Sequence, residues 1–348
     1  MINILLLGVG GNVSQGILKA LRRSSIEMWI VGACISPMSS GLYMCDEALL
    51  SPYANDPDFM PWLIEVCNEK QIDIILTGVE ENIFKIVSEI KVLESKTNAV
   101  FIASDYEKLT IGGDKFLTCE WLENNGLNYP HYSLTDDIHA CRKLVSEVGY
   151  PLIMKPRNGK SSRGVFKITN EQELEEILGT KDGVLQECIG DERHEYTVGC
   201  YCDKNGLLQG MIVMRRNLKN GSTAYANVEQ NDSIIQEVKK ICDVFKPKGP
   251  FNVQLRIDQK GRPVPFEFNV RFSGTTAIRS VFGFRDVEAM LKEYILDERI
   301  TDCFQVKKGQ VFRYEEELYV FDEAVVEMTE RGYIEDIKEK KIYKSDEI

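Results

Sequence analysis

The sequence predicts a protein of α/β and α+β type, in which an N-terminal parallel α/β domain precedes two α+β lobes. Strand-like and helix-like patterns alternate through the first hundred residues, as in an open parallel sheet covered by helices. This alternation pauses at residues 104–113. Long strands of period two then dominate residues 196–269, which indicates a mainly antiparallel sheet.

Residues 1–105 form the predicted parallel domain. Its strands are short apolar runs, and its helices have apolar residues at helical spacing. The opening run lacks a basic flank and continues directly into glycines, so we interpret it as a strand rather than a signal peptide. The expected strands are 2–7, 29–35, 72–77 and 99–103, and the expected helices are 13–23, 57–70 and 82–93.

Three further segments follow: a small α+β lobe at 106–188, a large lobe at 189–310 and a strand and helix extension at 311–348. In the small lobe we expect helices at 114–124, 136–148 and 171–178, a strand hairpin at 151–156 and 164–169, and a strand at 183–187. In the large lobe we expect strands at 196–202, 206–215, 250–257 and 263–269, a flexible segment at 217–226 and a helix at 232–245. Residues 312–314 are expected to return as a strand against the main sheet.

The composition narrows the class of protein. Hydrophobic residues make up 43% and charged residues 28%, as in ordinary globular proteins, and no apolar run approaches the roughly 18 residues of a membrane span. The net charge of −12 argues against nucleic-acid binding. The 10 cysteines include no Cys-x-x-Cys pair, which favours buried thiols in a reducing cytosol over a metal site. We therefore expect a cytoplasmic protein with small-molecule partners, without nucleic-acid or membrane contact.

A glycine-rich turn, Gly8-Val9-Gly10-Gly11-Asn12, follows the first strand and opens the first helix. Backbone N–H groups at such a helix start attract anions. A dinucleotide fingerprint would require a third glycine where Val13 stands, and the second strand ends without an acidic residue for a ribose. A tight packing turn and an anion or substrate pocket both remain open.

A second glycine-rich loop, residues 157–164, follows Lys155 at the end of an apolar strand. Its two glycines relax the backbone, so successive N–H groups can point at one anion. The candidate phosphate-binding residues in it are Asn158, Gly159, Lys160, Ser161 and Ser162. A lysine that closes a buried strand needs an anionic partner, which a nucleotide phosphate or a structural carboxylate would supply. The alternative is a solvated hairpin.

The sharpest group of polar residues is Gln254, Glu267 and Asn269. Glu267 and Asn269 alternate on one strand and so leave the same face, and a hairpin can bring Gln254 beside Glu267. Hard oxygen ligands with few charges suit Mg²⁺ that shares its remaining sites with phosphates. On the same face, Arg271 can neutralise a γ-phosphate or a developing acyl phosphate. We expect Phe266 on the opposite, apolar face. The alternative is a solvated polar face.

In their order, these motifs resemble the ATP-grasp superfamily, and within it the carbamoyl-phosphate-synthase-like and carboxylate–amine ligase branch. The resemblance covers roughly residues 1–310. It implies a Rossmann-like pre-ATP-grasp domain followed by a two-lobed ATP-grasp fold. It rests on the helix-opening Lys115, the strand-end Lys155, the loop 157–164, the hinge Gln186-Glu187-Cys188-Ile189 and the set Gln254, Glu267, Asn269 and Arg271.

The resemblance also implies roles for single residues. Lys115 and Lys155 resemble the two basic residues that embrace the ATP phosphates, and the loop resembles the flap that closes over them. The hinge resembles the segment that reads adenine through Glu187 and Ile189, and Glu195 the acidic residue that holds the ribose. Gln254, Glu267 and Asn269 resemble Mg²⁺ ligands, with Mn²⁺ able to substitute; many relatives have glutamate at the position of Gln254. Lys155 and Arg271 are the implied catalytic residues.

The implied activity is ATP-dependent ligation. A substrate carboxylate attacks the γ-phosphate to give an acyl phosphate and ADP, and an amine then displaces phosphate. We expect Arg215 and Arg279 to bind the acceptor's carboxylate, with ordinary surface salt bridges as the alternative, and Glu80 and Glu81 to face an amine. A carboxyl or carbamate kinase, a nucleotide-binding regulatory protein and, last, a nicotinamide dehydrogenase remain alternatives. The oligomeric state stays open, with a homodimer as one choice.

Overall fold

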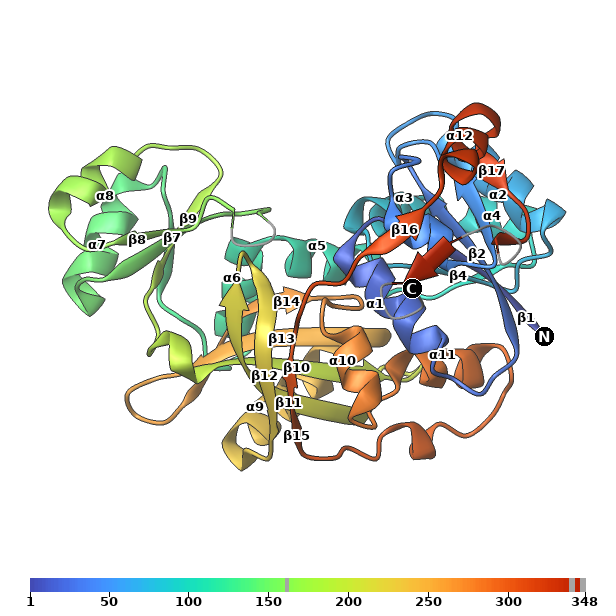
Figure 1. Ribbon diagram of the computed structural model, residues 1–348. Helices are drawn as coiled ribbons and strands as arrows, with labels where there is room; N and C mark the ends of the chain where they lie inside the picture. The colour runs from blue at the N-terminus through green and yellow to red at the C-terminus, as the bar shows by residue number, and fades with distance from the viewer. Residues whose placement is uncertain (160–162, 338–341, 345–348) are drawn as a thin grey trace. The chain divides into compact units, whose positions relative to one another are not determined.

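The computed structural model describes residues 1–159, 163–337 and 342–344 and divides into two compact units (Figure 1). The N-terminal unit comprises residues 1–106, 271–306 and 314–348, and the central unit comprises 107–270 and 307–313. The segment 271–306, which the sequence placed in the large lobe, therefore packs with the N-terminal sheet. The division into the four predicted segments stays a prediction.

A six-stranded sheet forms the core of the N-terminal unit, in the order β17-β3-β2-β1-β4-β5. All of its pairings are parallel except that of β17 with β3. The central strand β1 is apolar except for Asn3, because helices cover both faces of such a sheet. The strands are β1 Ile2–Leu7, β2 Met28–Cys34, β3 Glu47–Leu50, β4 Ile74–Thr77, β5 Val100–Phe101 and β17 Tyr333–Ile334.

The helices of this unit follow the predicted order with two corrections. The helix expected at 82–93 is two helices, because Glu89 leaves the helical conformation at φ −120° and ψ 22°. The pause expected at 104–113 contains a helix. The helices are α1 Asn12–Leu21, α2 Phe59–Glu69, α3 Glu80–Ser88, α4 Ile90–Lys96, α10 Thr276–Val281, α11 Asp286–Tyr294 and α12 Asp322–Arg331, with short 3₁₀ turns at Ser40–Met44 and Thr301–Cys303. The helix α5 Tyr106–Gly113 begins at the last residue of the segment 1–106 and continues into the central unit.

A four-stranded antiparallel sheet, in the order β6-β9-β7-β8, forms the smaller layer of the central unit. The predicted hairpin around the glycine-rich loop is confirmed as β7 and β8. Leu144, Leu152 and Leu185 are among the buried residues that join the sheet to its helices. The elements are α6 Lys115–Asn124, β6 Tyr132–Leu134, α7 Ile138–Val148, β7 Leu152–Pro156, β8 Phe166–Ile168, α8 Glu171–Ile177 and β9 Gly183–Glu187.

A six-stranded antiparallel sheet, in the order β14-β13-β10-β11-β12-β15, forms the larger layer. The prediction of a flexible segment at 217–226 is wrong, since β11 and β12 form a hairpin there. Its turn, Asn220-Gly221, has φ +52° and +72°, as tight hairpin turns require. The elements are the 3₁₀ turn Glu192–His194, β10 Glu195–Cys202, β11 Leu208–Lys219, β12 Ser222–Glu229, α9 Asp232–Phe245, β13 Gly249–Ile257, β14 Pro263–Asn269 and β15 Gly309–Phe312.

The C-terminal residues contribute strands to both units. The strand β15 pairs with β12, which confirms the expected return to the main sheet at Phe312. Two further strands, β16 Leu318–Val320 and β18 Ile342–Lys344, pair with each other. All ten cysteines are free thiols, and only Cys188 is half-exposed. Among the described residues, no helix has the length and apolarity needed to cross a bilayer.

Candidate functional site

The hairpin of β13 and β14 brings the predicted metal ligands together. Its turn is fixed by Asp258, whose carboxylate accepts hydrogen bonds from the backbone N–H groups of Lys260 and Arg262. Within the hairpin, Gln254 lies directly opposite Glu267. The predicted adjacency of these two side chains is therefore confirmed.

A β-bulge lies at this point of the hairpin. Gln254 pairs with Glu267 but Leu255 pairs with Pro265, so Phe266 is an extra residue on β14. The bulge turns Phe266 away from the apolar face on which the sequence placed it. Its ring lies 4.3 Å from the Nζ atom of Lys155, whereas Phe268 is buried against Trp121 and other aromatic rings. The expected position of Phe266 is thus corrected.

Hydrogen bonds fix the orientation of the polar side chains on this face. Glu267 Oε1 accepts from Gln254 Nε2 at 2.7 Å and from Asn269 Nδ2 at 3.2 Å. Arg216 Nη2 donates to Gln254 Oε1 at 2.6 Å. A flipped Gln254 amide would turn its NH₂ group toward the guanidinium donor, so the carbonyl of Gln254 is directed at Arg216 and its amide N–H₂ at Glu267.

This orientation defines which oxygens suit a cation. No described residue donates a hydrogen bond to Glu267 Oε2 or Asn269 Oδ1, so these two oxygens can accept an ion. A carboxylate and an amide oxygen side by side are hard ligands of the kind that Mg²⁺ accepts. The residues present therefore fit a divalent ion, although Gln254 contributes through its N–H₂ group to Glu267 rather than through its oxygen.

Lys155 approaches this face from β7. Burial lowers the pKa of Lys155 to about 8, while the negative charge of Glu267 acts in the opposite direction. No carboxylate of the described residues lies within ion-pair distance of its ammonium, which instead lies over the Phe266 ring. A poorly solvated ammonium without an ion-pair partner is stabilised when an anion binds beside it.

Lys115 begins α6 and is bound to the backbone of the glycine-rich loop. Asp114 caps the helix by accepting from the backbone N–H groups of its first turn, and it pairs with Arg157 at 2.6 Å. Lys115 Nζ donates to the carbonyl of Gly159 at 2.7 Å. The loop is therefore tied at its first residues to the start of α6, and Lys115 lies directly beside it.

The remaining loop residues are only partly described. Asn158 is exposed and Gly159 is half-buried. The predicted phosphate-binding residues Lys160, Ser161 and Ser162 lie outside the described residues. Their role stays a prediction.

The predicted hinge follows β9. The carboxylate of Glu187 accepts from the backbone N–H of His131 at 3.2 Å, and its own N–H donates to the His131 carbonyl. Ile189 is buried. Gly190 has φ +53°, and a Cβ atom there would lie 2.2 Å from the Ile257 carbonyl oxygen. Only glycine therefore fits at this position beside β13.

Glu195, the expected ribose ligand, is buried between two arginines. One oxygen accepts from Arg216 at 3.1 Å, and the other accepts from Arg256 at 2.8 Å. Sequence reasoning missed both arginines. Arg256 could have been found, because it follows Gln254 by two residues on one strand and therefore shares its face.

The predicted substrate residues have structural partners of their own. Arg215 forms an ion pair with Glu229 at 2.8 Å on neighbouring strands. Arg279 and Asp286 are fully buried in the N-terminal unit and form an ion pair at 2.6 Å. A buried guanidinium that is already neutralised has little charge to offer a substrate carboxylate, so this geometry argues against the role expected for Arg279.

Arg271 also belongs to the N-terminal unit. Its Nη2 atom lies 2.6 Å from Glu80 Oε1, and its Nε atom donates to the same oxygen at 2.9 Å. Glu80 opens α3, where the sequence expected it and Glu81 to face an amine. The structure thus joins two residues that the sequence assigned to different tasks, and the catalytic role of Arg271 stays a prediction.

Two segments of the chain match models of known families. Residues 4–101 match the model of the PylC-like N-terminal domain. Residues 182–318 match the model described as ATP-grasp in the biosynthetic pathway with Ter operon. The second match contains β13 and β14 with Gln254, Glu267 and Asn269.

Curated relatives and solved structures agree with these matches. The chain is 23% identical over 313 residues to the carbamoyl phosphate synthase large chain of Archaeoglobus fulgidus, and the match covers 82% of this chain but 28% of that protein. It is similar in fold to the biotin carboxylase domain of Hydrogenobacter thermophilus 2-oxoglutarate carboxylase, solved with MgADP and bicarbonate, with a TM-score of 0.67, 17% identity and coverage of 88% and 73%. An L-amino acid ligase from Bacillus licheniformis gives a TM-score of 0.67 at 15% identity, with coverage of 92% and 80%.

Proposed function

Since the chain carries an ATP-grasp domain behind a PylC-like N-terminal domain, we propose that it is an ATP-dependent ligase. It activates a small-molecule carboxylate as an acyl phosphate and joins it to an amine, with ATP as phosphoryl donor and Mg²⁺, or Mn²⁺ in its place, as the ion. We place this activity in the cytosol, and we propose a homodimer as the assembly. The chain spans 28% of the Archaeoglobus fulgidus relative, so the substrates of that longer protein are not assigned to it.

One observation supports this proposal above the others. The ammonium of Lys155 lies beside Phe266 and Glu267, on the face where Glu267 and Asn269 keep one oxygen each for an ion. A phosphate chain bound to a metal ion needs a cationic side chain next to the hard oxygen ligands of that ion. Lys155, whose pKa is lowered, lies in this position beside Glu267.

The residues of this face have separate tasks in the proposal. Glu267 Oε2 and Asn269 Oδ1 hold the ion, which neutralises charge on the phosphates when it is bound. Lys155 and Lys115 stabilise phosphate oxygens, and the loop at Asn158 and Gly159 continues into the three residues proposed to cover them. The hinge at Glu187 and Ile189 faces the adenine edge with its backbone.

The role that we propose for Glu195 differs from the ribose ligand expected from the sequence. Because both of its oxygens are held by guanidinium groups, a ribose hydroxyl would share a carboxylate that is already fixed in place. Arg215 remains a proposed contact for a substrate carboxylate, and Arg271 a proposed stabiliser of the transferring phosphoryl group. Arg279 is not retained.

The proposed reaction balances without a dedicated protein base. A carboxylate oxygen forms a bond to the γ-phosphorus as the bond to the ADP oxygen breaks. The amine nitrogen then forms the C–N bond, phosphate leaves with the electrons of the C–O bond, and the leaving phosphate takes up the proton that the amine loses. Such chemistry depends mainly on positioning and on neutralising phosphate charge.

The test is the release of ADP from MgATP with a panel of small carboxylates, each with and without amines. We expect release that depends on one carboxylate and one amine together. Release with a carboxylate alone would instead indicate a carboxyl or carbamate kinase. Tight ATP binding without turnover for any pair would indicate a regulatory protein and would contradict the ligase proposal.

A further inference from the structure

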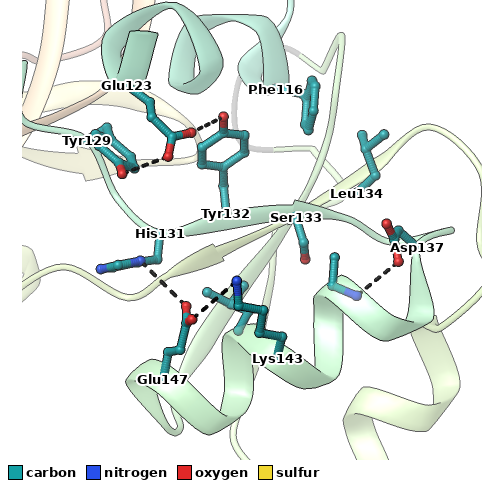
Figure 2. A pocket seen from close by; sticks show the side chains of 12 residues that line it. Phe116, Glu123, Tyr129, His131, Tyr132, Ser133, Leu134, Asp137, Lys143 and Glu147 are labelled. Carbon is teal, nitrogen blue, oxygen red and sulfur yellow. Dashed lines mark hydrogen bonds and ion pairs between the residues drawn. The ribbon is translucent and has the colours of Figure 1, made fainter. Parts of the chain in front are cut away.

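A second concave site lies in the central unit, on elements that do not carry the proposed metal ligands. The helices α6 and α7 and the strand β6 line an open cavity of about 360 Å³. Figure 2 shows that aromatic rings line one part of it, that Glu123 stands among them, and that Glu147 lies at another edge. Its volume lies within the range of small-molecule sites, and its lining combines apolar and polar groups in similar measure.

The aromatic wall consists of Phe116, Tyr129 and Tyr132. Tyr132 meets both neighbours edge to face, with ring centroids 5.3 Å from Phe116 and 6.1 Å from Tyr129. The face of an aromatic ring carries negative potential and attracts cations. The ring of Phe116 already has a cation near its face, since the guanidinium carbon of Arg157 lies 5.4 Å from its centroid.

Glu123 supplies the charge of the cavity. One of its oxygens accepts from the Tyr129 hydroxyl at 2.9 Å, and the other accepts from the Tyr132 hydroxyl at 2.7 Å (Figure 2). Both donors are neutral, and burial together with Glu123 raises the pKa of each phenol, which keeps the hydroxyls protonated. The two hydrogen bonds therefore fix the carboxylate in place without compensating its charge.

The other carboxylates of the cavity differ from Glu123. Glu147 has the ammonium of Lys143 at 3.6 Å and the ring of His131 at 3.9 Å. Asp137 caps α7 by accepting from the Ala140 N–H. Within the part of the chain that the structure describes, Glu123 has no basic side chain at ion-pair distance. Of these three carboxylates, Glu123 is the one that has neither a basic side chain nor a helix N-terminus beside it, and it stands at the aromatic wall.

We propose that this cavity binds a small primary ammonium attached to a flat apolar body. The ammonium donates to the remaining lone pairs of Glu123, and the apolar body packs against Tyr129 and Tyr132. An anion would meet three carboxylates. A bare metal ion would find apolar ring carbon where it needs further oxygen ligands. The proposal does not depend on the ligase activity, since none of these contacts involves the proposed ion or phosphate residues.

The test is isothermal titration of the full chain with phenethylammonium chloride, and with 2-phenylethanol as the neutral isostere. We expect saturable binding of the ammonium at millimolar concentration or below, and binding of the alcohol weaker by about tenfold or more. This comparison uses the unmodified protein, so it does not depend on the folding of any variant. Equal binding of both probes, or no binding of the ammonium, would overturn the proposal.

Two matched variants locate the site. Glu123→Gln keeps the shape of the side chain and removes its charge, and we expect about tenfold weaker ammonium binding. Glu147→Gln removes a carboxylate that is already paired, and we expect a change of less than about threefold. Both positions are exposed, so thermal unfolding should confirm that both variants are folded. If both variants bind as the unmodified protein does, the ammonium binds elsewhere and the assignment is wrong.

Discussion

Two carboxylates on the large sheet, Glu267 and Glu195, lie on the strands at either side of β13 and have opposite surroundings. Neutral amide groups of Gln254 and Asn269 hold Glu267, which leaves one of its oxygens available for an ion. Two arginines hold Glu195, and both of its oxygens are engaged. The same side-chain type is thus prepared for a ligand at one position and fixed as a structural anchor at the other.

Arg216 connects the two regions. It donates to Glu195 and to the carbonyl of Gln254. The second contact directs the N–H₂ group of Gln254 toward Glu267. Through Arg216, Glu195 therefore helps to set the orientation of Gln254 beside Glu267. Substitutions can separate the structural role of Glu195 from the proposed ion-binding role of Glu267.

The largest expected effect is that of Glu267→Ala on catalysis. Loss of the proposed ion ligand should lower ADP release at least about a hundredfold with the substrate pair that the panel identifies, while the thermal unfolding midpoint changes little. Glu175→Ala, which removes an exposed carboxylate of α8 in the same unit, is the control and should keep full activity. Full activity in Glu267→Ala would remove this residue from the site.

Glu195→Gln should act mainly on stability. It leaves two poorly solvated guanidinium groups without their counter-charge, so we expect a loss of about 3 kcal/mol in the free energy of unfolding, measured in urea. Glu229→Gln breaks the more exposed pair with Arg215 and should cost less than about 1 kcal/mol. Equal costs for the two variants would show that Glu195 is not the anchor described here.

Lys155 should take up a proton when nucleotide binds. Its pKa of about 8 lies below its ordinary value of 10.5. Phosphates beside it raise that pKa, so binding of MgATP at pH 8 should take up about half a proton per site. Titration calorimetry in buffers of different ionisation enthalpy measures this uptake. Lys155→Arg, which is always charged, is the control and should show none; uptake in that variant would assign the proton to another group.

The same lowered pKa has a consequence for stability. Between about pH 8 and 10.5, Lys155 is protonated to a larger extent in the unfolded chain than in the folded chain. The destabilising contribution of this residue should therefore be present below pH 8 and should decrease as the pH rises through that window.

Gln254→Glu should have a smaller effect than Glu267→Ala or Glu195→Gln. A carboxylate beside Glu267 adds negative charge to the proposed ion site, and Arg216 compensates part of it. We expect the Mg²⁺ concentration for half-maximal ADP release to fall by about threefold to tenfold, with little change in the maximal rate. An unchanged Mg²⁺ dependence would indicate that this side chain lies too far from the ion to affect it.

Strongly periodic parts of the molecule could be predicted from the sequence. The strand β1, the helix α9 and the strand β14 begin and end at the predicted residues because their apolar spacing is clear and their ends are marked. The adjacency of Gln254 and Glu267 followed from one hairpin and the two-residue period of a strand.

Features that depend on tertiary contacts were not predictable in the same way. The bulge at Phe266 shifts the period by one residue, which no local pattern indicates. The burial of Arg279 against Asp286 depends on packing between helices. By contrast, the hairpin at Asn220-Gly221 was available from the sequence, since that pair is a strong turn signal.

Binding of Mn²⁺ in the presence of ADP, followed by electron paramagnetic resonance, tests most directly whether Glu267 holds the ion, and it requires no substrate. The unmodified protein should bind the ion, Glu267→Ala should bind it at least about tenfold more weakly, and Gln254→Ala should stay within about threefold of the unmodified protein. Glu267→Ala that binds Mn²⁺ as tightly as the unmodified protein would contradict the assignment of Glu267 as the residue that holds the ion.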